Sequence, residues 1–162
     1  FEEKPTVQTV ISTMLDATSD NITPYFAYLE SKEKSVHWLL TFASLLEREA
    51  TAKTDRETIA SVFYNRMDEG MPLQTDPTVL YALGEHKDRV LFEDLEVQDP
   101  YNTYVNTGLP PGPIANAGKS SIEAVVDPSV SDYFYFLADK EGNNHFAKTY
   151  DEHLANRAKY ID

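Results

Sequence analysis

The stretch from residue 98 to residue 118 constrains the fold most, because few regular structures can contain it. Prolines and glycines occupy seven of its positions, namely Pro100, Gly108, Pro110, Pro111, Gly112, Pro113 and Gly118. Proline cannot donate the backbone hydrogen bond that a helix interior or a central strand requires. The sequence therefore predicts a long irregular loop, and loops of this length inside compact domains are disproportionately functional.

Helical spacing dominates the chain before this loop. Apolar residues recur every three or four positions, and in one stretch they cover a stripe wide enough for a largely buried helix. Capping residues such as Asp and Thr, together with Gly and Pro as stop signals, mark the ends of these runs. We expect helices over residues 7–15, 33–52, 54–70 and 76–84, the first ending in the polar stretch 16–23.

The chain after the loop contains a run that is typical of strands. Residues 132–137 are rich in aromatic side chains, and a turn over residues 140–144 leads into a second short run, 145–148, so we expect a hairpin. Capping-box patterns at Ser120–Glu123 and Thr149–Glu152 predict a helix on either side of it. The predicted fold class is α+β: a helix-rich domain with a small antiparallel hairpin and a long Pro/Gly-rich cleft loop.

Length and composition fit one globular domain and exclude several functions. The chain has 162 residues, of which 41% are hydrophobic, too many for a disordered segment. With 14 Lys+Arg against 27 Asp+Glu, its formal charge of −13 disfavours nucleic acid as a partner, because such binding needs cationic side chains. Without cysteine, thiol catalysis and disulfides are excluded. We expect an N-terminal helical segment, residues 1–35, that packs on or leads into a main domain, residues 36–162.

Two glutamates interrupt an apolar helical run. On a helical wheel of about 100° per residue, Glu49 falls between Phe42 and Leu45, and Glu47 falls on a different face. An apolar, partly desolvated environment favours the protonated carboxyl and raises its pKa toward the range of a general acid. The alternative is that both acids merely rim a buried helix and pair with arginines such as Arg48. The periodicity leaves both interpretations open.

Further polar residues are candidates for a binding cleft. Asp76 is a third candidate carboxylate, although an Asp before Pro also caps helices. Tyr101, Asn102 and Tyr104 precede the proline-stiffened run 108–114, and aromatic faces combined with amides and hydroxyls bind sugars. The alternative is that these tyrosines fill the edge of the core.

No motif for a metal or a nucleotide cofactor is present. The four histidines have no metal-ligand spacing, and the sequence contains no P-loop and no G-x-G-x-x-G; the histidines are His37, His86, His145 and His153. We therefore expect neither a metal nor a cofactor.

Five blocks of the sequence together resemble one enzyme family. They are ASLLERE (43–49), VFYNRM (62–67), LQTDPT (73–78), YNTY (101–104) and GLPPGPI (108–114). In order and spacing they resemble the MltG (YceG-like) endolytic murein transglycosylases, and the resemblance runs from about Leu39 to the C-terminus.

The resemblance implies cleavage of peptidoglycan between N-acetylmuramic acid and N-acetylglucosamine without added water. One carboxyl protonates the leaving oxygen and then takes the proton from the muramoyl C6 hydroxyl as a 1,6-anhydro ring closes. The resemblance implies that this acid belongs to block 43–49, and we expect Glu49, with Glu47 as second choice. It carries over five residues as substrate-binding: Gln74, Asp76, Tyr101, Asn102 and Tyr104.

The resemblance also implies a place and partners. We expect glycan strands as substrate, cell-wall synthases of the elongation machinery as partners, and action at the extracytoplasmic face of the plasma membrane. The full-length protein would be anchored by a segment outside this sequence. Two alternatives stay open: a glycan hydrolase that uses the same site, with Asp76 or another acid activating water, and a non-catalytic saccharide-binding or docking module.

Overall fold

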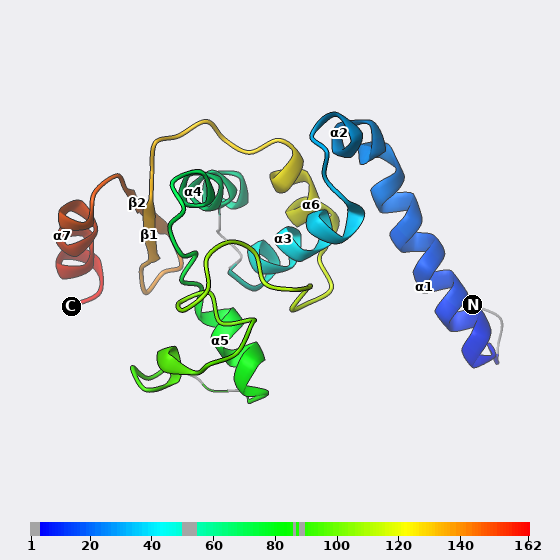
Figure 1. Cartoon of the computed structure of the whole chain (residues 1–162), viewed down its shortest axis with the longest axis horizontal. Coiled ribbons are helices and arrows are strands. Elements are labelled where there is room, and N and C mark those ends of the chain that lie inside the picture. Colours follow the sequence, from blue (N-terminus) through cyan, green and yellow to red (C-terminus); the bar gives the residue numbers. More distant parts are fainter. Residues whose placement is uncertain (1–3, 50–54, 86, 88–89) are drawn as a thin grey trace. The chain divides into compact units, whose positions relative to one another are not determined.

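The structure is a computed structural model that describes residues 4–49, 55–85, 87 and 90–162. Contacts divide the chain into two compact units, residues 1–36 and 37–162. Figure 1 shows the order of the elements along the chain. The predicted helical residues 50–52 and the predicted capping residue Thr54 lie outside the described residues.

The first unit is helical. It contains α1 (Val7–Ile22), a short 3₁₀ helix η1 (Thr23–Tyr25) and α2 (Phe26–Ser31). Helix α1 extends almost to the end of the polar stretch, because Asp, Ser and Asn cost only tenths of a kcal/mol in a helix and the first proline is Pro24. No helix in the described part of the chain is both long enough and apolar enough to cross a membrane.

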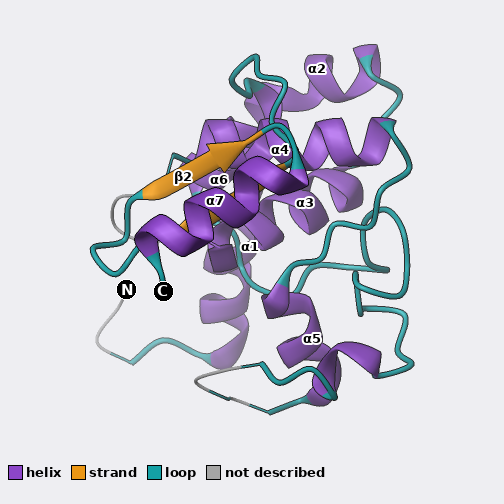
Figure 2. Cartoon of the chain, turned by 90° about the vertical axis from the view of Figure 1, so that its left-hand side faces the viewer, coloured by secondary structure: helices purple, strands orange, loops and turns teal. Residues whose placement is uncertain are grey.

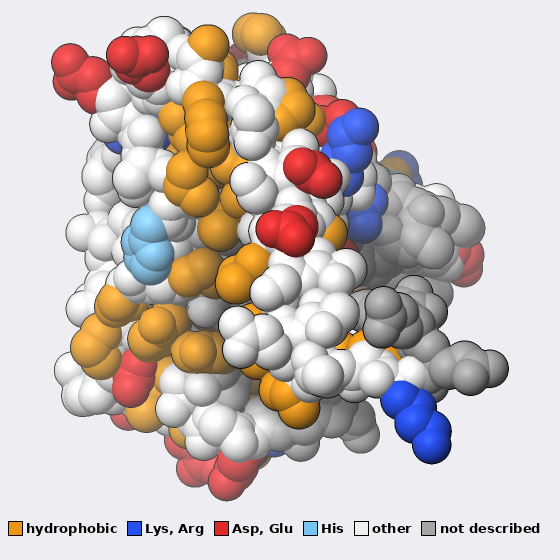
Figure 3. Space-filling view, turned by 90° about the vertical axis from the view of Figure 1, so that its right-hand side faces the viewer, with side chains coloured by type: hydrophobic (Ala, Val, Ile, Leu, Met, Phe, Trp, Pro, Cys, Tyr) orange, Lys and Arg blue, Asp and Glu red, His pale blue; other side chains and the backbone are white. Residues whose placement is uncertain are grey.

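Helix α1 keeps much of its apolar face exposed. Its exposed large side chains are Val7, Ile11, Met14 and Leu15. Hydrophobic side chains also gather at the surface on the face shown in Figure 3. In the described residues of α1, only Ile22 is buried.

The core of the second unit is built by α3 (Val36–Glu49), α4 (Arg56–Asp68) and α6 (Lys119–Val126). Fully buried Phe42 packs against the rings of Phe63 and Tyr64, with centroid distances of 6.1 and 4.9 Å. The burial of α3 agrees with the wide apolar stripe in the sequence. Helix α4 starts after Asp55, whose carboxylate accepts the backbone N–H of Thr58 at 2.9 Å.

The predicted hairpin is confirmed. Strands β1 (Tyr135–Ala138) and β2 (Asn144–Ala147) pair antiparallel, with Tyr135 opposite Ala147. Helix α7 (Tyr150–Tyr160) begins with the predicted capping box at Thr149 and Glu152, and Figure 2 shows it lying along the hairpin. The described residues thus form a helix-rich α+β fold with a two-stranded sheet, as predicted.

The capping box predicted at Ser120–Glu123 is wrong. Helix α6 begins two residues earlier, with Gly118 in place of Ser120 at its N-cap and no capping side chain of its own. The carboxylate of Glu47 instead accepts the backbone N–H of Gly118 at 3.0 Å and the hydroxyl of Ser121. A side chain from a different helix therefore satisfies this helix start.

The Pro/Gly-rich stretch is irregular but well anchored. It follows α5 (Asp76–Leu83), which ends at Gly84 in the left-handed conformation, and the short 3₁₀ helix η2 (Asp94–Glu96). Thr103 holds the segment before α5, because its hydroxyl accepts the N–H of Thr75 at 3.1 Å and its carbonyl accepts the N–H of Gln74 at 3.1 Å. The loop thus fixes the backbone that carries Gln74 and Asp76.

Asn102 organises this loop from inside. Its side chain is 0% exposed, and its amide donates to the carbonyls of Leu95 and Val97, both at 2.9 Å, while its carbonyl oxygen accepts the N–H of Tyr104 at 2.9 Å. All of these partners are backbone groups, so the amide ties the residues around η2 to the first part of the loop.

Replacing Asn102 with Ala should destabilise the protein by about 2 kcal/mol, because it leaves three partly buried backbone groups without partners. Denaturant unfolding measures the loss. Asn106→Ala is the matched control: its exposed amide also bonds two carbonyls, those of Asp99 and Asn102, and water can replace it. Equal losses for the two variants would contradict the role given to Asn102.

Candidate active site

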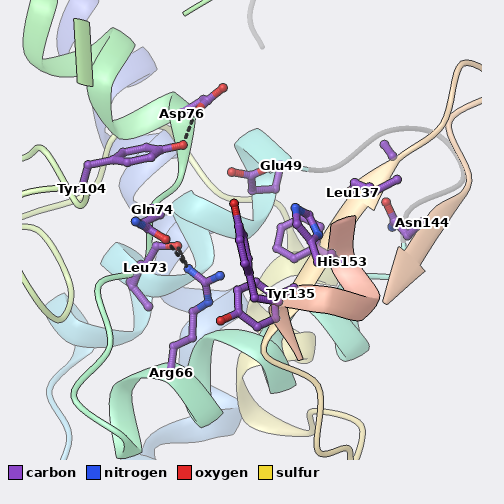
Figure 4. Close-up of a pocket in the computed structure, with 13 residues that line it drawn as sticks. Glu49, Arg66, Leu73, Gln74, Asp76, Tyr104, Tyr135, Leu137, Asn144 and His153 are labelled. Carbon is purple, nitrogen blue, oxygen red and sulfur yellow. Dashed lines mark hydrogen bonds between the residues drawn. The ribbon is translucent and has the colours of Figure 1, made fainter. Parts of the chain in front are cut away.

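One pocket collects polar side chains from segments far apart in the sequence. It has a volume of about 360 Å³ and is lined by Glu49, Arg66, Leu73, Gln74, Asp76, Tyr104, Tyr135, Phe136, Leu137, Ala138, Asn144, Tyr150 and His153. Figure 4 shows Glu49 between the pair formed by Asp76 and Tyr104 and the side chain of His153. The floor and walls come from α4, the segment before α5 and the hairpin.

Glu49 is the glutamate of the 43–49 block that lines this pocket. It is the last residue of α3, whose buried apolar positions fix where its side chain emerges. Burial raises the pKa of Glu49 to about 7, and the negative charge of Asp76 adds to the rise. The nearby Thr75 hydroxyl opposes the rise, but it makes no hydrogen bond of regular geometry, so desolvation dominates. Near neutral pH this carboxyl exchanges its proton readily.

Glu47 has the opposite environment although it lies two residues away. Its carboxylate holds the start of α6 through Gly118 and Ser121, and it is not among the residues that line the pocket. The hydrogen bonds from the Ser121 side chain and the Gly118 backbone lower the pKa of Glu47. Glu47 is thus an ionised structural group, and the structure brings only Glu49 to the pocket.

Arg66 ties the pocket together. Its side chain is 7% exposed and donates to the carbonyls of Phe134 at 2.6 Å and of Leu73 at 3.0 Å. It also donates to Oε1 of Gln74 at 3.3 Å, and its guanidinium lies 5.1 Å from the ring centre of Tyr135. Burial lowers the pKa of Arg66, but a guanidinium stays charged at neutral pH.

Gln74 and Asp76 are held at the mouth of the pocket, and both are exposed. Gln74 has a left-handed backbone with φ of 54°, uncommon outside glycine and a feature that recurs at functional sites. The Tyr104 hydroxyl donates to Asp76 at 2.6 Å, and burial together with this bond raises the pKa of Tyr104. Asp76 is not the N-cap of α5, a position that Thr75 occupies.

The structure does not bring Tyr101 and Asn102 into this pocket. Tyr101 packs on Tyr81, with ring centroids 4.7 Å apart. Asn102 has its polar atoms engaged by backbone groups, as described above. Of the five residues expected to bind substrate, Gln74, Asp76 and Tyr104 line the pocket.

Sequence reasoning assigned no role to two residues on the far wall, Asn144 and His153. Nδ2 of Asn144 and Nδ1 of His153 are buried and have no hydrogen-bond partner in the structure. Burial lowers the pKa of His153, and the charges of Arg66 and Arg157 act in the same direction, so its imidazole is neutral near pH 7. His153 lies in a part of the sequence that resembles the family, but its spacing from the other histidines fits no metal-binding motif, so it was not singled out.

The arrangement suits acid–base chemistry on a polar ligand. A carboxyl that can be protonated near pH 7 faces an open pocket with a second acid and hydrogen-bonding groups around it. Within the described residues, no cluster of three His, Asp or Glu side chains could hold a metal ion.

Comparison with known proteins finds relatives that all belong to one family or carry one name. The model of the YceG-like family matches residues 1–159, which include the N-terminal segment. The chain is 56% identical over 155 residues to an endolytic murein transglycosylase of Bacillus subtilis (strain 168), covering 96% of this chain and 43% of that protein. It is 38% identical over 168 residues to the protein of that name from Streptococcus pneumoniae (serotype 2 strain D39), covering 100% of this chain and 30% of the relative.

A solved structure agrees with these relatives. The crystal structure of a putative YceG-like protein from Listeria monocytogenes matches with a TM-score of 0.91 and 53% identity, covering 96% of this chain and 51% of the other. The chain spans less than half the length of each of these two curated relatives.

The raised pKa of Glu49 predicts a pH-dependent stability. The folded state holds the Glu49 proton up to about pH 7, whereas in the unfolded chain the pKa is near 4.5. This stabilisation is complete below pH 4.5 and is lost as the pH rises through 7, by up to about 3 kcal/mol. Glu49→Gln should therefore gain stability relative to the wild type between pH 5 and pH 8, as measured by urea unfolding at both values.

Glu47→Gln is the matched control on the same helix. Because the pKa of Glu47 is lowered, its stabilising effect is present above its unfolded pKa and is lost only in acid, as the pH falls through the folded pKa. This variant should show no relative gain between pH 5 and pH 8. A gain in Glu47→Gln and none in Glu49→Gln would reverse the assignment of the two environments.

Proposed function

Because the chain belongs to the YceG-like family, we propose that it is the catalytic part of an endolytic murein transglycosylase, with Glu49 as general acid and base. One observation carries the choice of residue: Glu49 is the glutamate of the 43–49 block that lines the pocket, and its pKa is raised to about 7. The relatives that carry this activity in their names share 56% and 38% identity with the chain.

In the first step, protonated Glu49 donates its proton to the glycosidic oxygen between the two sugars. The leaving oxygen departs as an alcohol, and positive charge develops at the anomeric carbon of the muramoyl ring. The negative charge of Asp76 lies close enough to affect Glu49, so it also stabilises that developing positive charge. A carboxyl whose pKa is near 7 is protonated in a large fraction of molecules at neutral pH, as this step requires.

In the second step, ionised Glu49 takes the proton of the C6 hydroxyl of the same muramoyl ring. The oxygen of that hydroxyl bonds to the anomeric carbon and closes the 1,6-anhydro ring, and Glu49 returns to its protonated form. Atoms and charge balance without a water molecule or a second carboxylate nucleophile. One acid of intermediate pKa therefore serves both steps, whereas ordinary glycosidases use a pair.

The remaining pocket residues bind and orient the strand in this proposal. Exposed Gln74 and Asp76 supply hydrogen-bonding groups at the mouth, and Tyr104 adds a ring beside them. Asn144 and His153 add polar groups on the opposite wall. Tyr101 and Asn102 contribute indirectly, through the loop whose backbone holds Gln74.

The proposal extends to place and partners. Murein is the substrate, so we place the enzyme at the extracytoplasmic face of the plasma membrane, beside the cell-wall synthases of the elongation machinery. We also propose that residues 1–35 form a helical segment leading into a catalytic domain at 36–162. The division of contacts after Val36 supports this boundary.

One alternative keeps the site but changes the reaction. Asp76 faces the same pocket as Glu49, and a second carboxylate that activates water would make the protein a glycan hydrolase. The products distinguish the two, because transglycosylation leaves 1,6-anhydro-muramoyl ends and hydrolysis leaves reducing ends. Mass spectrometry of digested glycan strands detects both kinds of end.

Glu49→Gln should reduce cleavage of purified glycan strands to background, because an amide cannot donate or recover the proton. The fold should survive, since Gln fills the same volume without a charge to bury. Release of anhydro-muramoyl fragments measures the activity, and circular dichroism checks the fold.

Glu47→Gln serves as the control, and it should cleave strands at a rate close to that of the wild type. If Glu47→Gln were inactive and Glu49→Gln active, the two roles would be exchanged. If the wild type itself left strands intact, the protein would be a saccharide-binding or docking module instead of an enzyme.

A further inference from the structure

A second, smaller pocket adjoins the one that contains Glu49. It has a volume of about 190 Å³ and is lined by Asp76, Val90, Leu91, Phe92, Leu95 and Tyr104. Asp76 and Tyr104, which are joined by a hydrogen bond of 2.6 Å, line both pockets, so the two pockets adjoin at this pair.

Phe92 is the unusual residue of the second pocket. Its side chain is 88% exposed, and neighbouring Leu91 is 47% exposed. Leaving a phenylalanine in water forgoes about 2 kcal/mol of burial energy. A large aromatic ring exposed at the rim of a pocket is therefore a candidate for contact with a ligand.

The turn that carries Phe92 is held in one conformation. Asp94, only 6% exposed, accepts the N–H of Leu91 at 2.8 Å and the ammonium of Lys87 at 2.7 Å. The carbonyl of Phe92 itself accepts the N–H of Leu95 at 3.2 Å, and the carbonyl of Leu95 is held by Asn102 at 2.9 Å. The ring is thus presented by a fixed backbone, which lowers the entropy lost when a ligand stacks on it.

The chemistry of this pocket fits a sugar ring. A pyranose has an apolar face of C–H groups and an edge of hydroxyls. The aromatic and aliphatic side chains offer a surface for the former, and the Asp76 carboxylate offers an acceptor for the latter. An apolar peptide side chain would use Phe92 and Leu91 but would leave Asp76 facing an apolar group.

We propose that the pocket formed by Phe92, Leu91 and Leu95 is a subsite for a further sugar ring of the glycan strand, adjacent to the sugars that react at Glu49. The inference rests on the proposed function, because a glycan strand whose reacting sugars lie at Glu49 would place a further ring in the adjoining pocket. Continuity of the two pockets through Asp76 and Tyr104 supports one extended ligand. The Phe92 pocket then selects for strands long enough to reach it.

Phe92→Ala should raise KM for long glycan strands about 3- to 10-fold, the range expected for loss of one aromatic stacking contact. It should leave kcat unchanged, because the reacting bond lies in the other pocket. Cleavage of the shortest strand fragment that the wild type accepts should be unaffected. Phe92→Trp, which keeps a ring at this position, should restore the KM for long strands.

Val130→Ala is the matched control, because Val130 is also fully exposed, at 104%, and lines neither described pocket. It should behave as the wild type on every substrate. Both exposed positions tolerate truncation, so unfolding does not complicate the comparison.

The outcomes separate this inference from the proposed function. If the wild type cleaves strands and Phe92→Ala has the same KM at all lengths, the subsite is refuted and the function stands. The same holds if Phe92→Ala is normal on purified strands but no longer binds a protein partner, which would make the patch a protein-docking surface. If the wild type cleaves nothing, the proposed function is refuted, and the subsite is then tested by binding alone. Sedimentation measures the binding of long strands to the wild type and to Phe92→Ala. Weaker binding by Phe92→Ala would support the subsite, and equal binding would refute it.

Discussion

The site depends on one buried cation. A charged guanidinium inside a protein costs several kcal/mol unless every donor finds an acceptor. Hydrogen bonds from Nε of Arg66 to the carbonyl of Phe134, and from Nη1 to the carbonyls of residues 72 and 73 and to the side chain of Gln74, offset much of this cost. Because these acceptors belong to separate segments, the arginine fixes the hairpin and the segment before α5 against α4. The pocket walls are held at the distance that this one side chain spans.

The two glutamates near the end of α3 have different pKa values because their tertiary surroundings differ. Glu47 receives hydrogen bonds at the start of α6, which favour its charge, while Glu49 loses water and faces the charge of Asp76, which favour its proton. Both are glutamates of one helix end, two positions apart. Their side chains leave the helix on different faces, and their different pKa values come from what the rest of the chain brings next to each face.

The sequence predicted those parts of the structure that local rules decide. The hairpin, the capping box at Thr149 and the irregular loop follow from propensity and from proline chemistry, and the structure has all three. The helical wheel separated Glu47 from Glu49, but it could not say which face meets a pocket. Asn102 is of a residue type that often binds sugars, so we expected it to contact substrate. In the structure it anchors the loop instead, because the carbonyls of Leu95 and Val97 reach it only in the folded chain. Asn144 and His153 were missed for the same reason: no local pattern links them to a glutamate about a hundred positions earlier.

The left-handed backbone at Gln74 limits how this protein can diverge. A residue at that position must tolerate φ of 54°, a conformation that β-branched side chains resist, and it must also extend far enough for its oxygen to meet Arg66. Glycine meets the first demand and fails the second, and valine or isoleucine fails both. Position 74 therefore accepts few amino acids, because a replacement must adopt this backbone conformation and still place an acceptor beside Arg66.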